Sequence, residues 1–362
     1  MKNTFGNSLS VTLFGESHGG AIGAVLDGLS PGIKIDEDFI RHQLSLRRPG
    51  GRISTARCER DDFRILSGVS GGYTCGTPIC IIIENTDTKS GDYDNLKDLP
   101  RPSHADYTAR MKYHGFEDTA GGGHFSGRIT APLVAAAAIV MPALSAKGIS
   151  IGTHIKKIMS EEDRNFSDIK NDIRYLADAE FPVLDATAGE KMRAEILAAA
   201  SEGDSVGGIL ETAVLGMPAG AGEPWFDTVE GVLSHALFSV PAVKGVEFGA
   251  GFEFANMHGS NANDNFAVDN GTVVTKTNNN GGVLGGITSG MPIIFRCAVK
   301  PTPSIAKAQN TFNMKTLIEK EISVSGRHDP CIVHRARVVI DSVTALALAD
   351  LLSLRFGTDW LA

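Results

Sequence analysis

The sequence has few aromatic residues and few cysteines. Phe, Trp and Tyr make up 7% of the 362 residues, and no aromatic run offers a platform on which nucleic-acid bases could stack. The five cysteines form no CxxC pair, and their odd number is typical of reduced thiols rather than of a disulfide framework or a zinc site. We therefore expect a protein without a structural metal.

Long apolar runs are also missing. The longest extends from Leu133 to Met141 and lies between Pro132 and Pro142, whereas a transmembrane helix needs about 20 apolar residues. The first residues, MKNTFGNSLSVTLFGESHGG, contain no apolar segment followed by a small-residue cleavage site. The sequence predicts a cytoplasmic protein that neither spans a membrane nor carries a secretory signal.

Positive charge is scarce overall but concentrated in one segment. Lys and Arg number 34 against 42 Asp and Glu, which gives a net charge of −8. Residues 41–64 nevertheless contain seven arginines: Arg41, Arg47, Arg48, Arg52, Arg57, Arg60 and Arg64. Arginine binds carboxylate and phosphate groups bidentately. The cluster indicates a small anionic ligand rather than nucleic acid, and a polyanion-binding protein without catalytic activity remains an alternative.

Glycine is plentiful, with 41 residues in short clusters between apolar runs. Apolar and β-branched runs predict strands at residues 10–14, 79–83, 209–215 and 293–299. Helices are expected at residues 131–146 and 188–200. Because strands and helices are mixed without a regular βαβ alternation, the sequence predicts an α+β fold.

Two pairs of segments repeat in the same order. GGAIGAVLDGLSPG at 19–32 is similar to GGILETAVLGMPAG at 207–220, and GGYTCGTPI at 71–79 to GGITSGMPI at 285–293. Between these repeated segments, which we call echoes, each half of the chain is expected to form one amphipathic helix. The first helix has acidic residues from Asp36 at its start, and the second is capped by Asp227. We expect a single domain over 1–362 with an internal duplication of about 1–150 and 190–350.

The segment GESHG, residues 15–19, matches the GxSxG pattern of serine hydrolases. In that interpretation Ser17 is the nucleophile and lies on a sharp turn called a nucleophile elbow. Such an elbow needs a parallel sheet beneath it that is already built, whereas only one predicted strand precedes GESHG. In the other interpretation, a glycine-flanked loop presents Ser17 and His18 to a ligand close to the backbone. The hydrolase remains the second choice.

Four further segments combine polar side chains with glycine or proline. RPSHADYTARMKY, 101–113, places His104 before a predicted helix. AGGGHFSGRIT, 120–130, leads into the Ala-rich helix, so its amides and Arg128 can bind an anion. KPTPSI, 300–305, offers a lysine and two hydroxyls to a phosphate. In SGRHDPC, 325–331, Asp329 follows Arg327 closely, and an ionised carboxylate there can act as a base.

Taken in order, GESHG, RRPG, HADYT, GGGHFSGR, KPTPSI and GRHDPC resemble the chorismate synthase family, from about Thr4 to Leu351. The resemblance implies a lyase of the shikimate pathway, which supplies aromatic amino acid biosynthesis. It also implies a β-α-β sandwich, in which helices lie between antiparallel sheets and the two halves are pseudo-repeats, and a homotetrameric assembly.

Members of that family convert 5-enolpyruvylshikimate 3-phosphate to chorismate by a 1,4-anti elimination of phosphate, using reduced FMN with no net redox change. The implied partner is therefore a small anionic substrate with two carboxylates and a phosphate, which suits the arginine cluster. The implied cofactor is reduced FMN. The sequence leaves open whether NADPH reduces the flavin on this protein.

The resemblance also implies roles for individual residues. His18 and His104 would be the two catalytic histidines, one protonating the departing phosphate and the other stabilising negative charge near N1 and O2 of the reduced flavin. Asp329 would accept the flavin N5 proton. The implied substrate ligands are Ser17, Arg47, Arg52, Arg57, Ser126, Arg128 and Arg327. The implied FMN ligands are His124, Phe125, Ser126, Ala242, Gly285, Lys300, Pro301, Thr302, Pro303, Ser304 and Arg327.

Overall fold

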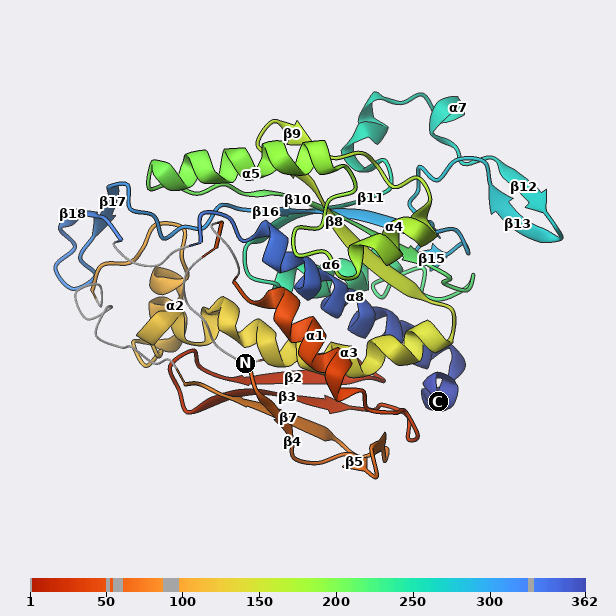
Figure 1. The fold of residues 1–362 in the computed structure, drawn as a ribbon, viewed down its shortest axis with the longest axis horizontal. Helices are drawn as coiled ribbons and strands as arrows, with labels where there is room; N and C mark the ends of the chain where they lie inside the picture. The colour runs from red at the N-terminus through yellow and green to blue at the C-terminus, as the bar shows by residue number, and fades with distance from the viewer. Residues whose placement is uncertain (1, 50–52, 55–60, 87–97, 325–328) are drawn as a thin grey trace.

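Two five-stranded antiparallel sheets enclose a layer of helices in the computed structural model (Figure 1), which describes residues 2–49, 53–54, 61–86, 98–324 and 329–362. The first sheet has the order β1 (Thr4–Phe5), β2 (Ser10–Gly15), β3 (Ala21–Asp27), β7 (Ile79–Glu84) and β4 (Phe63–Ile65). The second has the order β11 (Val243–Phe248), β16 (Ile293–Val299), β10 (Gly208–Leu215), β8 (Ser150–Ile158) and β9 (Glu161–Glu162). The mixed architecture confirms the predicted α+β class.

The helical layer contains α1 (Glu37–Arg47), α3 (Thr130–Ala146), α6 (Val229–Ser239) and α8 (Val333–Phe356). Helix α3 packs on the first sheet and α8 on the second, and the two helices contact each other. Both are apolar around most of their circumference, which is the pattern of a helix buried on all sides. The other helices are α2 (Asp106–Tyr113), α4 (Ile169–Leu176), α5 (Ala186–Ser201) and α7 (Gly259–Ala262).

The inner face of each sheet follows from alternation in its sequence. In β7 every second residue is a buried isoleucine, Ile79, Ile81 and Ile83. In β16 Ile293 and Phe295 begin the same alternation. Because successive side chains of a strand point to opposite faces, these residues all face the helices. The four strands and two helices predicted from the sequence are confirmed within one or two residues at each end.

Helix α1 is determined by local sequence. The side chain of Asp36 accepts a hydrogen bond of 2.9 Å from the backbone N–H of Phe39, so Asp36 is the N-cap. Glu37 and Asp38 in the first turn complement the helix dipole, as Arg47 does in the last turn. The helix ends two residues before Pro49, as predicted, because the residue before a proline avoids helical angles.

Helix α6 departs from the prediction at its start. The residue that caps it is Thr228 rather than Asp227: the Thr228 side chain accepts a hydrogen bond of 2.8 Å from the backbone N–H of Gly231. A cap must lie immediately before the first helical residue, which here is Val229, so Asp227 is one position too early.

The two prolines that bracket the longest apolar run do not interrupt helix α3. Pro132 lies in its first turn, where no backbone donor is needed, and the helix continues through Pro142. Residues 127–146 are long and apolar enough to cross a membrane by length and composition, but 78% of that window is buried inside the fold. Burial between the two sheets, rather than interruption by proline, accounts for this segment.

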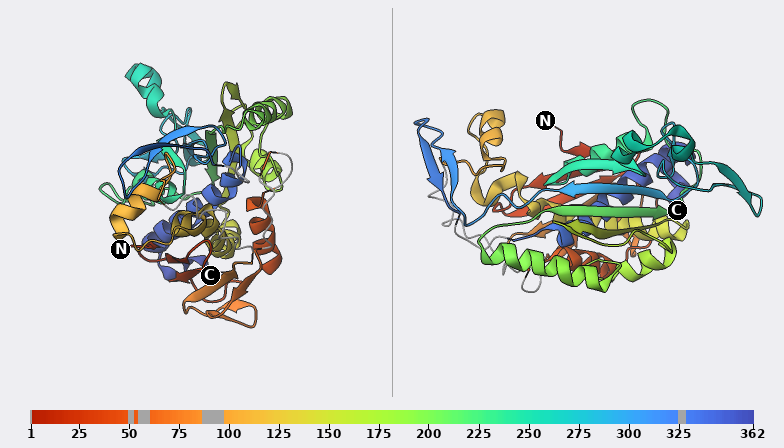
Figure 2. Two further views of the ribbon diagram at one scale, coloured as in Figure 1. Left: turned by 90° about the vertical axis from the view of Figure 1, so that its left-hand side faces the viewer. Right: turned by 90° about the horizontal axis from the view of Figure 1, so that it is seen from above.

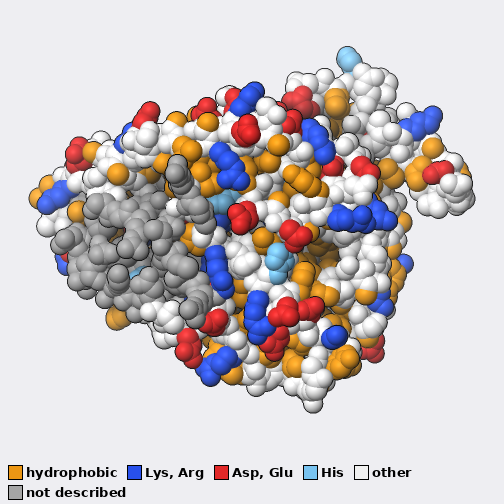
Figure 3. Space-filling view, in the orientation of Figure 1, with side chains coloured by type: hydrophobic (Ala, Val, Ile, Leu, Met, Phe, Trp, Pro, Cys, Tyr) orange, Lys and Arg blue, Asp and Glu red, His pale blue; other side chains and the backbone are white. Residues whose placement is uncertain are grey.

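Short hairpins and 3-10 segments lie outside the two five-stranded sheets. One hairpin lies beside α2 at one end and another projects at the opposite end (Figure 2). The hairpins are β5–β6 (Val69–Ser70, Tyr73–Thr74), β12–β13 (Phe266–Asp269, Thr272–Thr275), β14–β15 (Val283–Leu284, Ile287–Thr288) and β17–β18 (Gln309–Phe312, Glu319–Ile322). The 3-10 segments are η2 (Ala120–Phe125), η3 (Gly127–Ile129), η4 (Gly251–Asn256) and η5 (Thr358–Leu361). On the face shown in Figure 3, basic and acidic side chains are interspersed, without a continuous basic stripe among the described residues.

The two sheets share a strand order. In the first, β2, β3, β7 and β4 are neighbours in that sequence; in the second, β8, β10, β16 and β11 are. The first pair of echoes contains β3 and β10, and the second pair leads into β7 and β16. The repeated segments therefore occupy equivalent positions in the two sheets.

Candidate active site

Two glycine-rich loops predicted to bind ligands pack against each other. GESHG follows β2, and the GGGHFS loop of η2 precedes α3. The backbone N–H of Ser17 donates to the carbonyl of Gly123 at 3.1 Å. Nδ1 of His124 donates to the carbonyl of Gly15 at 2.8 Å. His124, predicted as a flavin ligand, thus holds the two loops together through one ring nitrogen.

The ring of His18 lies against Gly121. A Cβ atom placed on Gly121 would be 1.9 Å from Cε1 of His18, and Gly121 has a φ of +59°. A side chain here is excluded both by the imidazole and by the backbone conformation. The neighbouring Ser17 is fully buried, and its hydroxyl has no hydrogen-bond partner within the described part of the chain.

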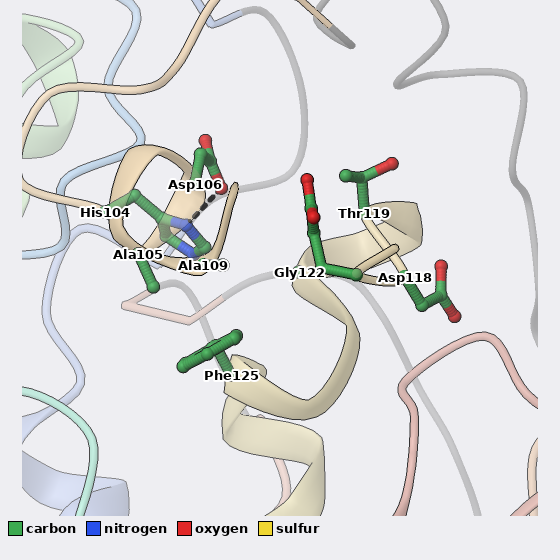
Figure 4. A pocket seen from close by; sticks show the side chains of 9 residues that line it. His104, Ala105, Asp106, Ala109, Asp118, Thr119, Gly122 and Phe125 are labelled. Carbon is green, nitrogen blue, oxygen red and sulfur yellow. Dashed lines mark hydrogen bonds and ion pairs between the residues drawn. The ribbon is translucent and has the colours of Figure 1, made fainter. Parts of the chain in front are cut away.

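His104 reaches the same loop from the other side. A Cβ atom on Gly122 would lie 3.4 Å from Cε1 and 3.6 Å from Nε2 of His104. The two predicted catalytic histidines therefore flank consecutive glycines, Gly121 and Gly122. Figure 4 shows His104 and Phe125 on the side of a small hollow of about 10 Å³, which is close to the space that one water needs.

A carboxylate holds His104 in place. Nδ1 of His104 is 2.6 Å from Oδ1 of Asp106, at the start of α2. Arg101 clamps the same carboxylate, with Nε 2.8 Å from Oδ2 and Nη2 2.8 Å from Oδ1. Burial would raise the pKa of Asp106, but the hydrogen bonds from Arg101 and His104 outweigh it and hold that pKa far below its usual range.

The KPTPSI segment docks on the loop that carries His104. Nζ of Lys300 donates to the backbone carbonyl of Ser103, and Nη1 of Arg101 is 3.4 Å from the hydroxyl of Ser304. The backbone N–H of Lys300 donates to the carbonyl of Ala242 at 2.9 Å. Predicted flavin ligands from two distant segments are thus brought beside His104.

Thr302 has a buried side-chain oxygen that finds no hydrogen-bond partner among the residues described. Its backbone carbonyl accepts a bond of 2.7 Å from the hydroxyl of Ser205. Burial and repulsion by Lys244 lower the pKa of the neighbouring Lys300. An anion placed here would accept a hydrogen bond from the hydroxyl and would favour the charged form of Lys300.

Arginines gather around one buried carboxylate on the other side of GESHG. Asp61 is fully buried; its Oδ2 is 2.8 Å from Nη2 of Arg47 and 3.9 Å from Nε of Arg48, and its Oδ1 bonds Arg128. Burial would raise the pKa of Asp61, but the charges of Arg47 and Arg128 lower it. These four side chains carry two positive charges in excess. The arginine cluster favours a further anion beside it.

Asn85 joins this arginine cluster to the loop of His18. Its Oδ1 accepts a bond of 3.1 Å from Nε of Arg128, and its Nδ2 donates to the carbonyls of Glu16 at 2.9 Å and Gly19 at 2.8 Å. The GESHG loop is therefore tied both to the arginine cluster and to the glycine loop.

Asp329 lies on the arginine side of the site. Its Oδ2 is 2.5 Å from Nη1 of Arg335 in the first turn of α8, and Nε of Arg335 donates to the backbone carbonyl of Arg47 at 2.9 Å. Burial lowers the pKa of the Arg47 guanidinium, and Asp61 opposes that effect. The predicted base is thus anchored to the end of α1.

Some predicted residues are not brought together. Gly285 lies at the start of α6, where Gly286 accepts a hydrogen bond from Val229, whereas Ala242 and Lys300 follow its other end. An 11-residue helix is about 16 Å long, so Gly285 is well separated from Lys300 within one chain. Ser126 caps η3, its hydroxyl accepting from the backbone of Arg128 at 3.3 Å. Arg52, Arg57 and Arg327 lie outside the described residues.

The sequence analysis missed the partners that hold these groups: Asp61, Asn85, Arg101, Asp106 and Arg335. A signal existed for Asp106, because the spacing of histidine and aspartate in HADYT allows a hydrogen bond within one turn. Asp61 was visible only as an acid inside an arginine-rich segment. Asn85 carried no signal.

Known proteins resemble this chain over nearly its full length. The family model described as chorismate synthase matches residues 9–353. A chorismate synthase of Pyrococcus abyssi is 48% identical over 97% of this chain and 97% of its own length, and one of Korarchaeum cryptofilum is 46% identical over 96% of both. A crystal structure of a chorismate synthase superposes with a TM-score of 0.77 at 29% identity, covering 98% of this chain and 94% of that one.

Proposed function

The chain belongs to the chorismate synthase family, and from this premise we propose which of its groups carry the reaction. Its activity is that of a phosphate lyase: the 1,4-anti elimination of phosphate from 5-enolpyruvylshikimate 3-phosphate, which gives chorismate. The geometry also argues against the hydrolase alternative. Strand β2 is paired antiparallel on both sides and leads into β3 rather than a helix, so GESHG is no nucleophile elbow.

The convergence of two imidazoles on one glycine loop carries the proposal. We place the substrate beside that loop, with its anionic groups toward Arg47 and Arg128, where the arginine cluster has excess positive charge. At about 4 Å and an effective dielectric constant near 20, each ion pair contributes roughly 4 kcal/mol before desolvation. Ser17 and Ser126 assist as hydroxyl donors, and Arg52, Arg57 and Arg327 are further proposed ligands on sequence grounds.

The two histidines take different roles because their neighbours differ. His18 belongs to the loop that Asn85 ties to Arg128, so we assign it to the departing phosphate, which it protonates. His104 belongs to the loop that Lys300 and Ser304 contact, so we assign it to the cofactor. Asp329, fixed by Arg335, is the proposed proton acceptor.

Reduced FMN is the family's cofactor, and the residues present fit it. The hydroxyl of Thr302, which has no hydrogen-bond partner within the described ranges, and the ammonium group of Lys300 suit a phosphate. We propose that these two bind it, with Pro301 and Pro303 stiffening the segment, and that Ser304, Ala242, Ser126, His124 and Phe125 complete the site; Gly285 and Arg327 are further candidates from sequence. When bound, reduced FMN supplies electron density as the allylic C–O bond breaks and recovers it afterwards.

We further propose a cytoplasmic homotetramer built from an internally duplicated chain. The equal strand orders of the two sheets support the duplication. The projecting β12–β13 hairpin exposes Phe266, Val268 and Val273, and exposed apolar side chains of this kind support an interface between subunits. Light scattering on a size-exclusion column tests the assembly: a monomer at micromolar concentration would refute it.

An anaerobic assay with reduced FMN tests the function. Phosphate release from 5-enolpyruvylshikimate 3-phosphate should require reduced flavin and should fall on His18→Ala, whereas a hydrolase would ignore flavin and depend on Ser17. Turnover that survives with oxidised FMN alone would contradict the proposal. The same assay under air with NADPH decides whether this protein reduces its own flavin.

A further inference from the structure

The carboxylate of Asp106 is occupied on both oxygens. Oδ2 accepts from the backbone N–H of Arg101 at 2.9 Å and from its Nε at 2.8 Å, and Oδ1 accepts from Nη2 of Arg101 at 2.8 Å and from Nδ1 of His104 at 2.6 Å. The side chain of Arg101 is only 9% exposed. A bidentate clamp on a partly buried carboxylate fixes the orientation of that carboxylate.

This arrangement determines which nitrogen of His104 carries a proton. An ionised carboxylate only accepts hydrogen bonds, so Nδ1 of His104 must be the donor. The Cε1–Nε2 edge of the ring then faces Gly122, where a Cβ on the glycine would lie 3.4 Å from Cε1 and 3.6 Å from Nε2, and His104 lines the small hollow. The ring can exchange a proton at Nε2 while its orientation is held through Nδ1.

The clamp also reaches the proposed flavin segment. Nη1 of Arg101 is 3.4 Å from the hydroxyl of Ser304, and Lys300 bonds the carbonyl of Ser103, one residue before His104. The orientation of the imidazole is therefore coupled to the position of the KPTPSI segment. Arg101 and Asp106 contact His104 directly, and Glu117 and Asp118 line the same small hollow.

We propose that Asp106, clamped by Arg101, is the positioning residue of His104: it fixes the Nδ1–H form and the orientation of the ring, so that Nε2 can exchange a proton next to the glycine loop. This inference rests on the proposed catalytic role of His104. It assigns to Asp106 no contact with substrate, so its removal should act on turnover and hardly on substrate binding.

The test is Asp106→Asn in the full-length protein, assayed anaerobically with reduced FMN. We expect kcat to fall about 100-fold and KM for the substrate to change less than about 3-fold. Asp106→Glu should restore part of the turnover.

Asp98→Asn is the matched control, because Asp98 bonds Lys315 at 2.7 Å in the same loop and does not contact His104 in any bond described. It should leave both kcat and KM unchanged. If Asp106→Asn does not fold, Arg101→Lys, which keeps a cation but loses the fork, should lower kcat by a smaller factor and leave KM for the substrate equally unchanged.

A double-mutant cycle separates the two proposals. If His104→Asn leaves turnover intact, the catalytic role of His104 is wrong. If His104→Asn abolishes turnover while Asp106→Asn keeps the wild-type kcat, only the positioning role is wrong. If both stand, the double variant should be no slower than His104→Asn alone, because the aspartate acts only through the histidine.

Discussion

Two of the histidines that contact carboxylates, His104 and His154, differ in which ring nitrogens those contacts use. His104 uses Nδ1 for Asp106 and turns Nε2 toward a hollow. His154, in β8, is fully buried and uses both nitrogens, with Nδ1 2.8 Å from Asp163 and Nε2 3.0 Å from Glu211. An imidazole with one free nitrogen can move a proton, whereas one bonded at both nitrogens can only join the elements around it.

The role of His154 follows from its partners. Asp163 also accepts bonds from the backbone of Leu184 and Asp185, at 2.6 and 2.9 Å, so the triad ties the start of α5 to β8 and β10. Burial would lower the pKa of His154, but the hydrogen bonds to Asp163 and Glu211 outweigh it and raise that pKa. His154 is a buried imidazolium that stabilises the second sheet.

The largest effect that separates the two histidines is on turnover. His104→Asn should lower kcat by roughly 10²- to 10⁴-fold, the range of general acid–base catalysis, and should leave the urea unfolding midpoint nearly unchanged. His114→Asn is the control: His114 ends α2 at a left-handed φ of +56°, a conformation that asparagine tolerates. A fall in kcat for the control would mean that α2 itself was disturbed.

The converse experiment removes a partner of the buried histidine. Glu211→Gln should lower the free energy of unfolding by about 3 kcal/mol, because it leaves a buried cation with one anion fewer. Turnover per folded molecule should stay at the wild-type value. Glu190→Gln, on the exposed face of α5, should change neither. An equal loss of stability in both variants would refute the role given to the triad.

A pH series sharpens the contrast further. The pKa of His154 is raised in the folded state, so its contribution to stability is complete below the unfolded value of about 6.5 and disappears as pH rises through the folded value. Urea unfolding at pH 6 and pH 9 should show lower stability at pH 9. His154→Gln should flatten that dependence; an unchanged slope in this variant would assign it to other groups.

The smallest effect belongs to a third histidine. His42 on α1 pairs with Asp178 at 3.2 Å, and the side chains are 39% and 87% exposed. Asp178→Asn should change the free energy of unfolding by less than about 0.5 kcal/mol and leave kcat unchanged, because exposed pairs are screened by solvent. A larger change would show that side-chain exposure does not determine the order of stabilising effects among the three histidine–carboxylate pairs.

Features fixed by neighbours in sequence could be predicted. The acidic start of α1 from Asp36 and the strand at residues 79–83 depend on residues close together in sequence, and both are confirmed. Thr228 and Asp227 are both good caps, so the choice between them depended on where α6 enters the helical layer. Pro142 was misjudged because propensity does not include burial between two sheets.

The candidate site also has one part that local motifs predict and another part that only the assembled fold determines. The motifs supplied its predicted ligands, because those residues belong to short recognisable segments. Asp61 could not be paired with Arg128, 67 residues further along, because only the assembled fold brings them together. Gly285 is the opposite case: the family resemblance implies that it shares a site with Lys300, and within one chain β16 and α6 run between them.

The contact between Gly121 and His18 limits which positions of the glycine loop can accept another amino acid. Gly127, six positions on, has open space around its Cβ and an ordinary φ, whereas Gly121 has neither. In a saturation library across this loop, position 127 would accept many amino acids and position 121 would return only glycine. Diversity in the loop can therefore enter on one flank only, and directed evolution of new substrates has to begin there.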